Sequence, residues 1–220
     1  VSEKEMVLFS DFRYKSSAER FLKTNSDWKF ILAKENLYTS VAGFFSSGSV
    51  VGIQSDNLSV DAFSKLKRSS CKVKYKGLSG KISALFIPKL HREINSIRRA
   101  AEIADKSFKE LITIIDPAMT EAEVARKLEM LCLQNGSEGP SFDTIVLSGS
   151  RSAHPHGRPG NNRLSKGKFI LIDFGCRYKG FCSDMTRTFA IGTISVKMKK
   201  IYQIVLDAQL HACEHARAGI

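Results

Sequence analysis

The sequence predicts two successive domains, an α/β domain over residues 1–88 and a second domain, of helices and a β-hairpin, over residues 89–220. In the first part, short apolar runs alternate with amphipathic segments, a pattern typical of α/β domains. A stretch rich in glycine and serine that closes on Pro88 then marks a boundary. Beyond it, two long helical patterns precede a hairpin pattern.

The composition is that of a globular protein. The 220 residues are 43% hydrophobic and 25% charged, which is enough for one large or two small domains with a real core. The sequence contains no apolar run of about 18 residues and no recognisable signal peptide, so we expect neither a membrane span nor secretion. The five cysteines are widely spaced and form no C-x-x-C, which favours reduced thiols and a cytoplasmic protein.

The net charge of +12, with a pI of about 9.6, raises the question of a nucleic-acid partner. The basic residues are spread along the whole chain. The densest basic stretch, between Asp61 and Glu93, has little aromatic interleaving beyond Tyr75 and no nucleic-acid-binding motif. A solvated basic face is therefore the favoured interpretation, and a nucleic-acid partner is disfavoured.

The first domain is predicted to alternate strands and helices. Apolar runs indicate strands, and amphipathic segments with serine near their starts indicate helices. Strands are expected at Met6–Ser10, Trp28–Ala33, Val50–Gln54 and Cys71–Tyr75, and helices at Ser16–Lys23 and Ser59–Arg68.

The second domain is predicted to open with two helices. Apolar residues recur at three- and four-residue steps from Ile94 to Ile115, and the pattern stops before Asp116-Pro117. Thr120 and Glu123 then form a capping box for a second helix, which ends at Asn135-Gly136. A further amphipathic helix is expected over Ser195–Arg217.

A β-hairpin is predicted between these helical regions. Its strands are Lys168–Gly175 and Phe181–Ile191, and Arg177–Gly180 supplies the turn. With Tyr178 and Lys179 as a two-residue loop, Asp173 would directly face Asp184 on one side of the sheet.

Two facing carboxylates in an apolar hairpin need a physical explanation. Like charges opposite each other repel, and burying them adds a desolvation cost. A shared proton or a divalent cation held between the oxygens would relieve this cost. The alternative is a slipped register that leaves both Asp173 and Asp184 in solvent.

The wider sequence resembles a known family. LIDFGCRYKGFCSDMTRTF, residues 171–189, is similar to the metal-binding hairpin of the pita-bread (M24) metallopeptidases. Upstream, Ser141–Val146 and Pro155-His156-Gly157 resemble the Xaa-Pro branch of that family, aminopeptidase P and prolidase. The resemblance implies a creatinase-like α/β domain, partial over residues 1–88, followed by the first half of an α+β pita-bread catalytic domain over residues 89–220.

The same resemblance implies roles for individual residues. Asp173 and Asp184 would be metal ligands, and His156 would contact the substrate and act at the scissile centre, where histidine suits proton transfer near neutral pH. Phe142 would line the substrate pocket, although an ordinary core position explains it equally well. Thr186 shares the predicted face of Asp184, so its hydroxyl is expected to orient a ligating carboxylate.

The implied function is that of an Xaa-Pro aminopeptidase, which cleaves proline-containing peptides before the proline. Two divalent ions, Mn²⁺ or Co²⁺ with Zn²⁺ as an alternative, would activate water, and the full-length enzyme is expected to be a cytoplasmic homodimer. Prolidase activity is the nearest alternative. A non-catalytic pita-bread module that binds protein or nucleic acid is an alternative from another class.

Two carboxylates do not complete a site for two ions. In the family, a histidine and two glutamates from the second half of the fold supply the remaining ligands. His211, Glu214 and His215 share one predicted helix, but the family places no ligands there. We therefore expect the 220 residues to be part of a longer enzyme and to be inactive alone.

Overall fold

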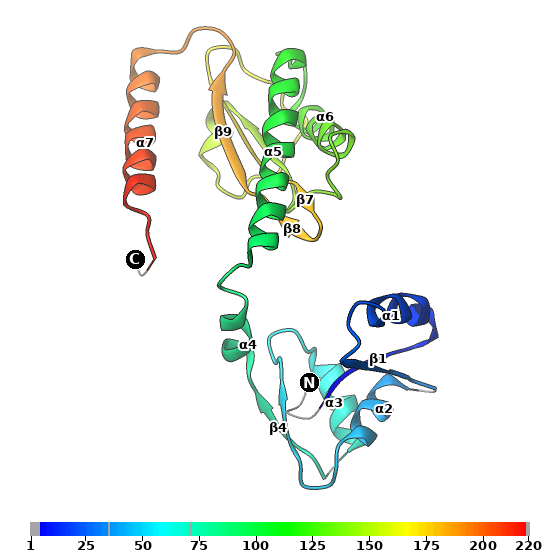
Figure 1. Cartoon of the computed structure of the whole chain (residues 1–220). Coiled ribbons are helices and arrows are strands. Elements are labelled where there is room, and N and C mark those ends of the chain that lie inside the picture. Colours follow the sequence, from blue (N-terminus) through cyan, green and yellow to red (C-terminus); the bar gives the residue numbers. More distant parts are fainter. Residues whose placement is uncertain (1–4, 35, 71, 219–220) are drawn as a thin grey trace. The chain divides into compact units, whose positions relative to one another are not determined.

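The computed structural model describes residues 5–34, 36–70 and 72–218, which fall into two compact units, Val1–Pro88 and Lys89–Ile220 (Figure 1). Both units combine helices with strands, as the sequence predicts. Within the described residues, no helix is both long enough and apolar enough to cross a lipid bilayer.

The first unit is built from strand–helix–strand arrangements in which paired strands run parallel. β1 pairs with β2, and β3 pairs with β4, each through a helical connection. This alternation confirms the α/β prediction. The elements are β1 (Met6–Ser10), η1 (Phe12–Tyr14), α1 (Lys15–Leu22), β2 (Trp28–Leu32), α2 (Leu37–Phe44), β3 (Val50–Ile53), α3 (Val60–Ser69), β4 (Lys74–Gly77) and α4 (Ser79–Leu85).

Three details of the first unit differ from the prediction. Helix α2 was not expected; it begins after Asn36, whose side chain accepts a hydrogen bond of 2.8 Å from the backbone of Tyr38. The strand expected at Cys71–Tyr75 lies later, at Lys74–Gly77, and Cys71 itself is outside the described residues. The boundary segment contains the short helix α4, and the hydroxyl of Ser79 in its first turn accepts a hydrogen bond of 2.9 Å from the backbone N–H of Asp56.

The second unit packs two helices on one face of a three-stranded antiparallel sheet. Strand β6 lies in the centre, between β5 and β9, and a separate two-stranded ribbon joins β7 to β8. The elements are α5 (His91–Ile114), α6 (Glu121–Gln134), β5 (Ile145–Ser148), η2 (Gly149–Ala153), β6 (Phe169–Phe174), β7 (Arg177–Tyr178), β8 (Phe181–Cys182), β9 (Met185–Ala190) and α7 (Val196–His215).

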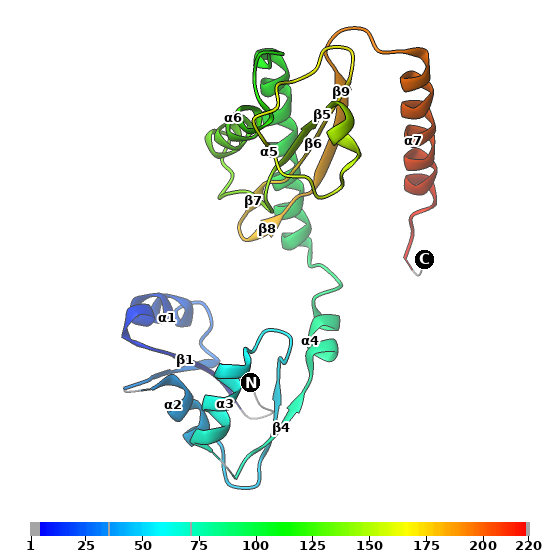
Figure 2. The same ribbon diagram turned by 180° about the vertical axis from the view of Figure 1, so that it is seen from behind.

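The core of the second unit lies between the sheet and the helices α5 and α6. Alternate residues of β6 are fully buried on this face, where they meet the apolar side of both helices. Figure 1 shows α5 crossing in front of the sheet, and Figure 2 shows the sheet from the opposite side. The core cluster comprises Ile103, Ala104, Leu111, Val124, Ala125, Leu128, Cys132, Val146, Leu164, Ile170, Ile172, Phe174, Cys176 and Met185.

The hairpin register differs from the predicted one. Asp173 pairs with Thr186, not with Asp184. The reason lies in the turn, where Lys179 and Gly180 both have positive φ, 49° and 76°, and so form the two-residue loop. Glycine adopts this conformation readily, so the loop sits one position later than expected.

The corrected register still leaves both acids on the same side of the hairpin. The shift moves Asp184 by two positions relative to the partner strand, and side chains alternate between faces with a period of two. Arg187 lies on the other face, where its guanidinium forms an ion pair of 3.2 Å with Asp105 of α5.

The cysteines that the structure describes are all free thiols, Cys132, Cys176, Cys182 and Cys213. Cys176 is fully buried, and its thiol lies against that of Cys132 on α6. The Cys132 thiol donates a hydrogen bond to the sulfur of Cys176, and this hydrogen bond, together with burial, raises the pKa of the Cys132 thiol far above its usual range.

Candidate active site

The second unit contains an open cavity of about 770 Å³ that collects most of the predicted site residues. Residues from α6, from the segment before β5, from the loop after η2 and from the hairpin line it. Phe142, His156, Asp173 and Asp184 are all among them. These four side chains, separated by up to 42 positions in the sequence, therefore share one cavity.

Asp173 is held at the carboxyl end of β6 on the face opposite to the helices. Its neighbours Ile172 and Phe174 point into the core, so the alternation of the strand directs Asp173 to the cavity. The carboxylate is half-buried, and its Oδ1 accepts a hydrogen bond of 2.9 Å from the hydroxyl of Thr186. Thr186 thus contacts one of the two carboxylates, while its part in orienting a metal ligand stays a prediction.

Asp184 lies just before β9 and is exposed. Of the two arrangements considered for the acids, burial does not hold for this residue, because the ladder is interrupted between β6 and β7 and again between β8 and β9. Asp184 also borders a second cavity, of about 720 Å³, between β9 and α7. Among the described residues, neither Asp184 nor Asp173 forms an ion pair.

The backbone at Gly175 passes close to the backbone at Ser183. This approach brings the segment that carries Asp173 next to the segment that carries Asp184. A Cβ atom on Gly175 would lie 2.0 Å from the carbonyl oxygen of Ser183, the residue before Asp184. The hydroxyl of Ser141 is 2.8 Å from the same carbonyl and 2.9 Å from that of Cys176. The glycine that follows Asp173-Phe174 is therefore required for this spacing.

His156 lies on an exposed loop, and a buried side chain outside the loop holds this loop in place. The loop follows η2, and His156 reaches the cavity together with Gly157 and Arg158. His154, in the same loop, is also exposed and keeps no assigned role. The position of His156 therefore depends on what holds the loop.

The loop is held by Glu121, a fully buried carboxylate that the sequence analysis did not single out. It accepts hydrogen bonds from the backbone of Ser148 (2.9 Å) and Gly160 (3.1 Å) and from Nε of Arg151 (3.1 Å). Glu121 opens α6, where an acidic residue is ordinary on an exposed surface. Only the tertiary fold reveals that this one is buried.

The donor set fits hard divalent cations. Two carboxylates on one face of a hairpin, without a cationic partner among the described residues, are oxygen ligands of the kind that Mn²⁺ and Mg²⁺ prefer. Within the described ranges, no third His, Cys, Asp or Glu comes within ligand distance of both Asp173 and Asp184. The residues therefore fit part of a metal centre.

Comparison with known proteins supports the same conclusion. The metallopeptidase family M24 model matches residues 95–220. The Xaa-Pro dipeptidase of Pyrococcus horikoshii is 39% identical over 186 residues, which are 84% of this chain and 52% of that protein. The Xaa-Pro dipeptidase of Pyrococcus furiosus is 37% identical over 192 residues, which are 87% of this chain and 55% of that protein.

Solved structures show the same fold. An Xaa-Pro dipeptidase from Bacillus anthracis has a TM-score of 0.92 and 34% identity, over 100% of this chain and 61% of that one. An X-Pro aminopeptidase from Thermotoga maritima has a TM-score of 0.89 and 31% identity, over 100% of this chain and 62% of that one. The chain thus spans about half the length of these curated relatives, and it shares the pita-bread fold of the solved peptidases. This chain belongs to metallopeptidase family M24.

Proposed function

We propose that the protein containing this chain is a metal-dependent Xaa-Pro aminopeptidase, which hydrolyses the bond between an N-terminal residue and proline. The observation that carries the proposal is the single cavity lined by Asp173, Asp184 and His156, in which neither carboxylate has a cationic partner among the described residues. Membership of a metallopeptidase family, with relatives named for Xaa-Pro substrates, supports it.

In this proposal, Asp173 and Asp184 hold the divalent ions, Mn²⁺ or Co²⁺ with Zn²⁺ as an alternative. A bound ion would supply an acidified water and a polarised scissile carbonyl. Thr186 keeps the Asp173 carboxylate oriented through its hydroxyl. His156 donates a hydrogen bond from a ring nitrogen to the bound peptide, and Phe142 offers an apolar wall of the cavity to it.

We further propose that residues 1–88 form part of an N-terminal domain and residues 89–220 the N-terminal half of the catalytic domain. Two carboxylates leave most of the coordination positions of two ions unfilled. The 220 residues alone are therefore expected to be inactive, and the remaining ligands to come from the longer protein.

The metal-ligand assignment is tested by Asp184→Ala in the full-length protein. Loss of this carboxylate is expected to abolish turnover that depends on added Mn²⁺, because no other described group can replace it. Asp27→Ala, which removes an exposed carboxylate from the first unit, is the control and should leave turnover unchanged. Activity of Asp184→Ala at the level of the parent protein would refute the assignment.

A second candidate is an Xaa-Pro dipeptidase, because the relatives from Pyrococcus horikoshii and Pyrococcus furiosus bear that name. The two activities differ in whether a residue may follow the proline. Cleavage rates on an Xaa-Pro dipeptide and on peptides extended beyond the proline separate them. Turnover of the dipeptide alone would favour the dipeptidase, and turnover of neither would favour a non-catalytic binding role.

We also propose a homodimer in the cytoplasm. The free thiols among the described cysteines support a reducing compartment. Light scattering on the full-length protein tests the dimer, and cell fractionation tests the location.

A further inference from the structure

The last turns of α7 carry a cluster of potential metal ligands that the proposed peptidase site does not use. His211, Glu214 and His215 are spaced so that they meet on one side of the helix. One ligand atom from each lies within 4.8 Å of the other two, and all three side chains are exposed. They are the one group of three or more such side chains found among the described residues.

The ring of His215 makes a hydrogen bond of the kind that metal-binding imidazoles make. Nδ1 of His215 donates a hydrogen bond of 2.8 Å to the backbone carbonyl of His211, which leaves Nε2 with its lone pair free. Ligating histidines usually donate their second ring nitrogen in this way, which fixes the tautomer and the ring orientation. The two ring centroids are 4.1 Å apart and the rings are tilted by 39°, and one ring nitrogen of each lies within 4.8 Å of the other.

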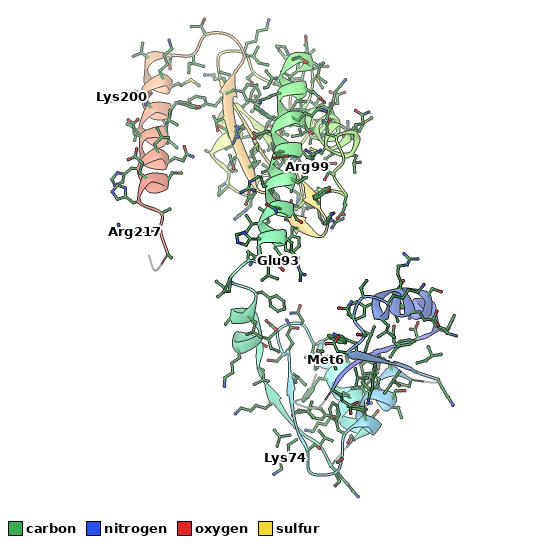
Figure 3. The ribbon with its side chains drawn as sticks, in the orientation of Figure 1. Met6, Lys74, Glu93, Arg99, Lys200 and Arg217 are labelled. Atoms are coloured by element: carbon green, nitrogen blue, oxygen red, sulfur yellow. The ribbon has the colours of Figure 1, made fainter. Side chains whose placement is uncertain are left out.

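The electrostatics of this region favour a cation. The carbonyl groups at the end of a helix carry partial negative charge, and Glu214 adds a full charge. No lysine or arginine occurs between residues 201 and 216 of the sequence. Figure 3 shows Lys200 near the start of α7 and Arg217 beyond its end.

The cluster is distinct from the cavity of the two aspartates. The second cavity, which Asp184 borders, is lined on α7 by Tyr202, Val205, Leu206 and Gln209. This lining stops before His211. The histidine cluster therefore lies further along α7 than the residues that line the cavity next to Asp184.

We propose that His211, Glu214 and His215 bind one divalent transition-metal ion of the Zn²⁺, Ni²⁺ and Cu²⁺ class. Two imidazole nitrogens and one carboxylate oxygen suit these ions, whereas Mg²⁺ and Ca²⁺ prefer sites made of oxygen alone. Three protein ligands leave at least one position for water. The bound ion links the last turns of α7 and adds to the stability of this helix end, because it binds only the folded arrangement.

The test uses Zn²⁺ alone as the probe, with the complete chain in an Asp173→Asn/Asp184→Asn background that removes the other proposed site. Competition with a zinc indicator is expected to show one site that Mg²⁺ does not displace. Adding His215→Ala is expected to weaken zinc affinity about tenfold or more, since loss of even an outer-shell partner has effects of that size. Cys213→Ser, which removes a nearby exposed thiol, should leave the affinity unchanged.

A spectroscopic readout separates ligation from a change in folding. With Cu²⁺ as the probe, electron paramagnetic resonance should show nitrogen couplings that disappear in His211→Ala/His215→Ala, while circular dichroism stays that of the parent. Zinc binding that is unaffected by the histidine substitutions, or that depends on Cys213, would overturn the proposal. Absence of a zinc site in the aspartate-deficient background would overturn it as well.

Discussion

The hydroxyl of Thr186 holds the Asp173 carboxylate in place, because it donates a hydrogen bond of 2.9 Å to Oδ1. A ligand oriented before the ion arrives loses less conformational freedom on binding. Thr186→Val removes the hydroxyl and keeps the shape of the side chain. We expect Mn²⁺ affinity of the full-length protein, measured by calorimetry, to fall about 10- to 100-fold.

Thr188→Val is the matched control for this experiment. Thr188 lies two positions further along β9, borders the same second cavity and pairs with Leu171, not with an acid. Its substitution should leave the affinity for Mn²⁺ at the parent value. Equal losses in both variants would show that the hydroxyl of Thr186 has no special part in the site.

Glu121 shows how a residue outside the cavity can position one inside it. Its buried carboxylate binds Arg151 and two backbone N–H groups of the segments that flank the His156 loop. A glutamine at this position would replace one carboxylate oxygen, which accepts hydrogen bonds, with an NH2 group. This group would face the N–H donors that now bind the carboxylate. Breaking a buried ion pair typically costs about 3–5 kcal/mol, so we expect Glu121→Gln to reduce the free energy of unfolding by roughly that amount.

Denaturant unfolding of the second unit checks this prediction. Glu102→Gln is the control, because its ion pair with Arg99 joins two side chains that are about half exposed. Exposed pairs contribute about 0–1 kcal/mol, so the control should be close to the parent protein. A loss for Glu121→Gln no larger than that of Glu102→Gln would contradict the anchoring role.

At the scale of single elements, the start of α6 is held by the predicted capping box. Glu123 accepts hydrogen bonds from the backbone N–H (2.7 Å) and hydroxyl (2.9 Å) of Thr120, and these lower the pKa of its carboxyl. Because the folded-state pKa lies below the ordinary value of 4.5, the stabilisation is present above that pH and is lost as the pH falls through the folded-state pKa.

We therefore expect Glu123→Gln to lower the stability of the chain at pH 7, and the difference from the parent to shrink below about pH 4.5. Thermal unfolding at a series of pH values, compared with Glu102→Gln, gives the measurement. A difference that stays constant down to pH 3 would show that the charge of Glu123 is not what stabilises the helix start.

Local patterns were sufficient to predict most elements. The three- and four-residue spacing of apolar side chains identified α5, and the Thr120–Glu123 pair identified the start of α6. The hairpin was also expected, but its register depended on Lys179 adopting a positive φ, which residue type alone does not favour. The short helix α2 was missed, since eight residues carry too little periodicity.

The candidate site was predictable only in part, for a related reason. Asp173, Asp184 and His156 stand in recognisable motifs, and the alternation of the strand places both acids on one face. The burial of Glu121 depends on Arg151, thirty positions later, and no local pattern connects the two. Contacts of this kind require the folded chain.

At the scale of the whole molecule, the described residues form two units that each have their own buried side chains. The core cluster of the second unit runs from Ile103 to Met185 and includes the fully buried Leu128 of α6. In the first unit, Leu66 of α3 is buried at 7% exposure. Since the cluster of the second unit draws only on its own residues, we expect the two cores to unfold in separate transitions.

Differential scanning calorimetry of the complete chain tests this expectation. Leu128→Ala should lower the stability of one transition by about 2–5 kcal/mol, the usual cost of such a truncation in a core, and leave the other in place. Leu66→Ala should lower the stability of the other transition and leave the first one in place. A single transition that both substitutions shift equally would mean that the chain folds as one cooperative body, because the loss of packing in either core would then be felt by the other.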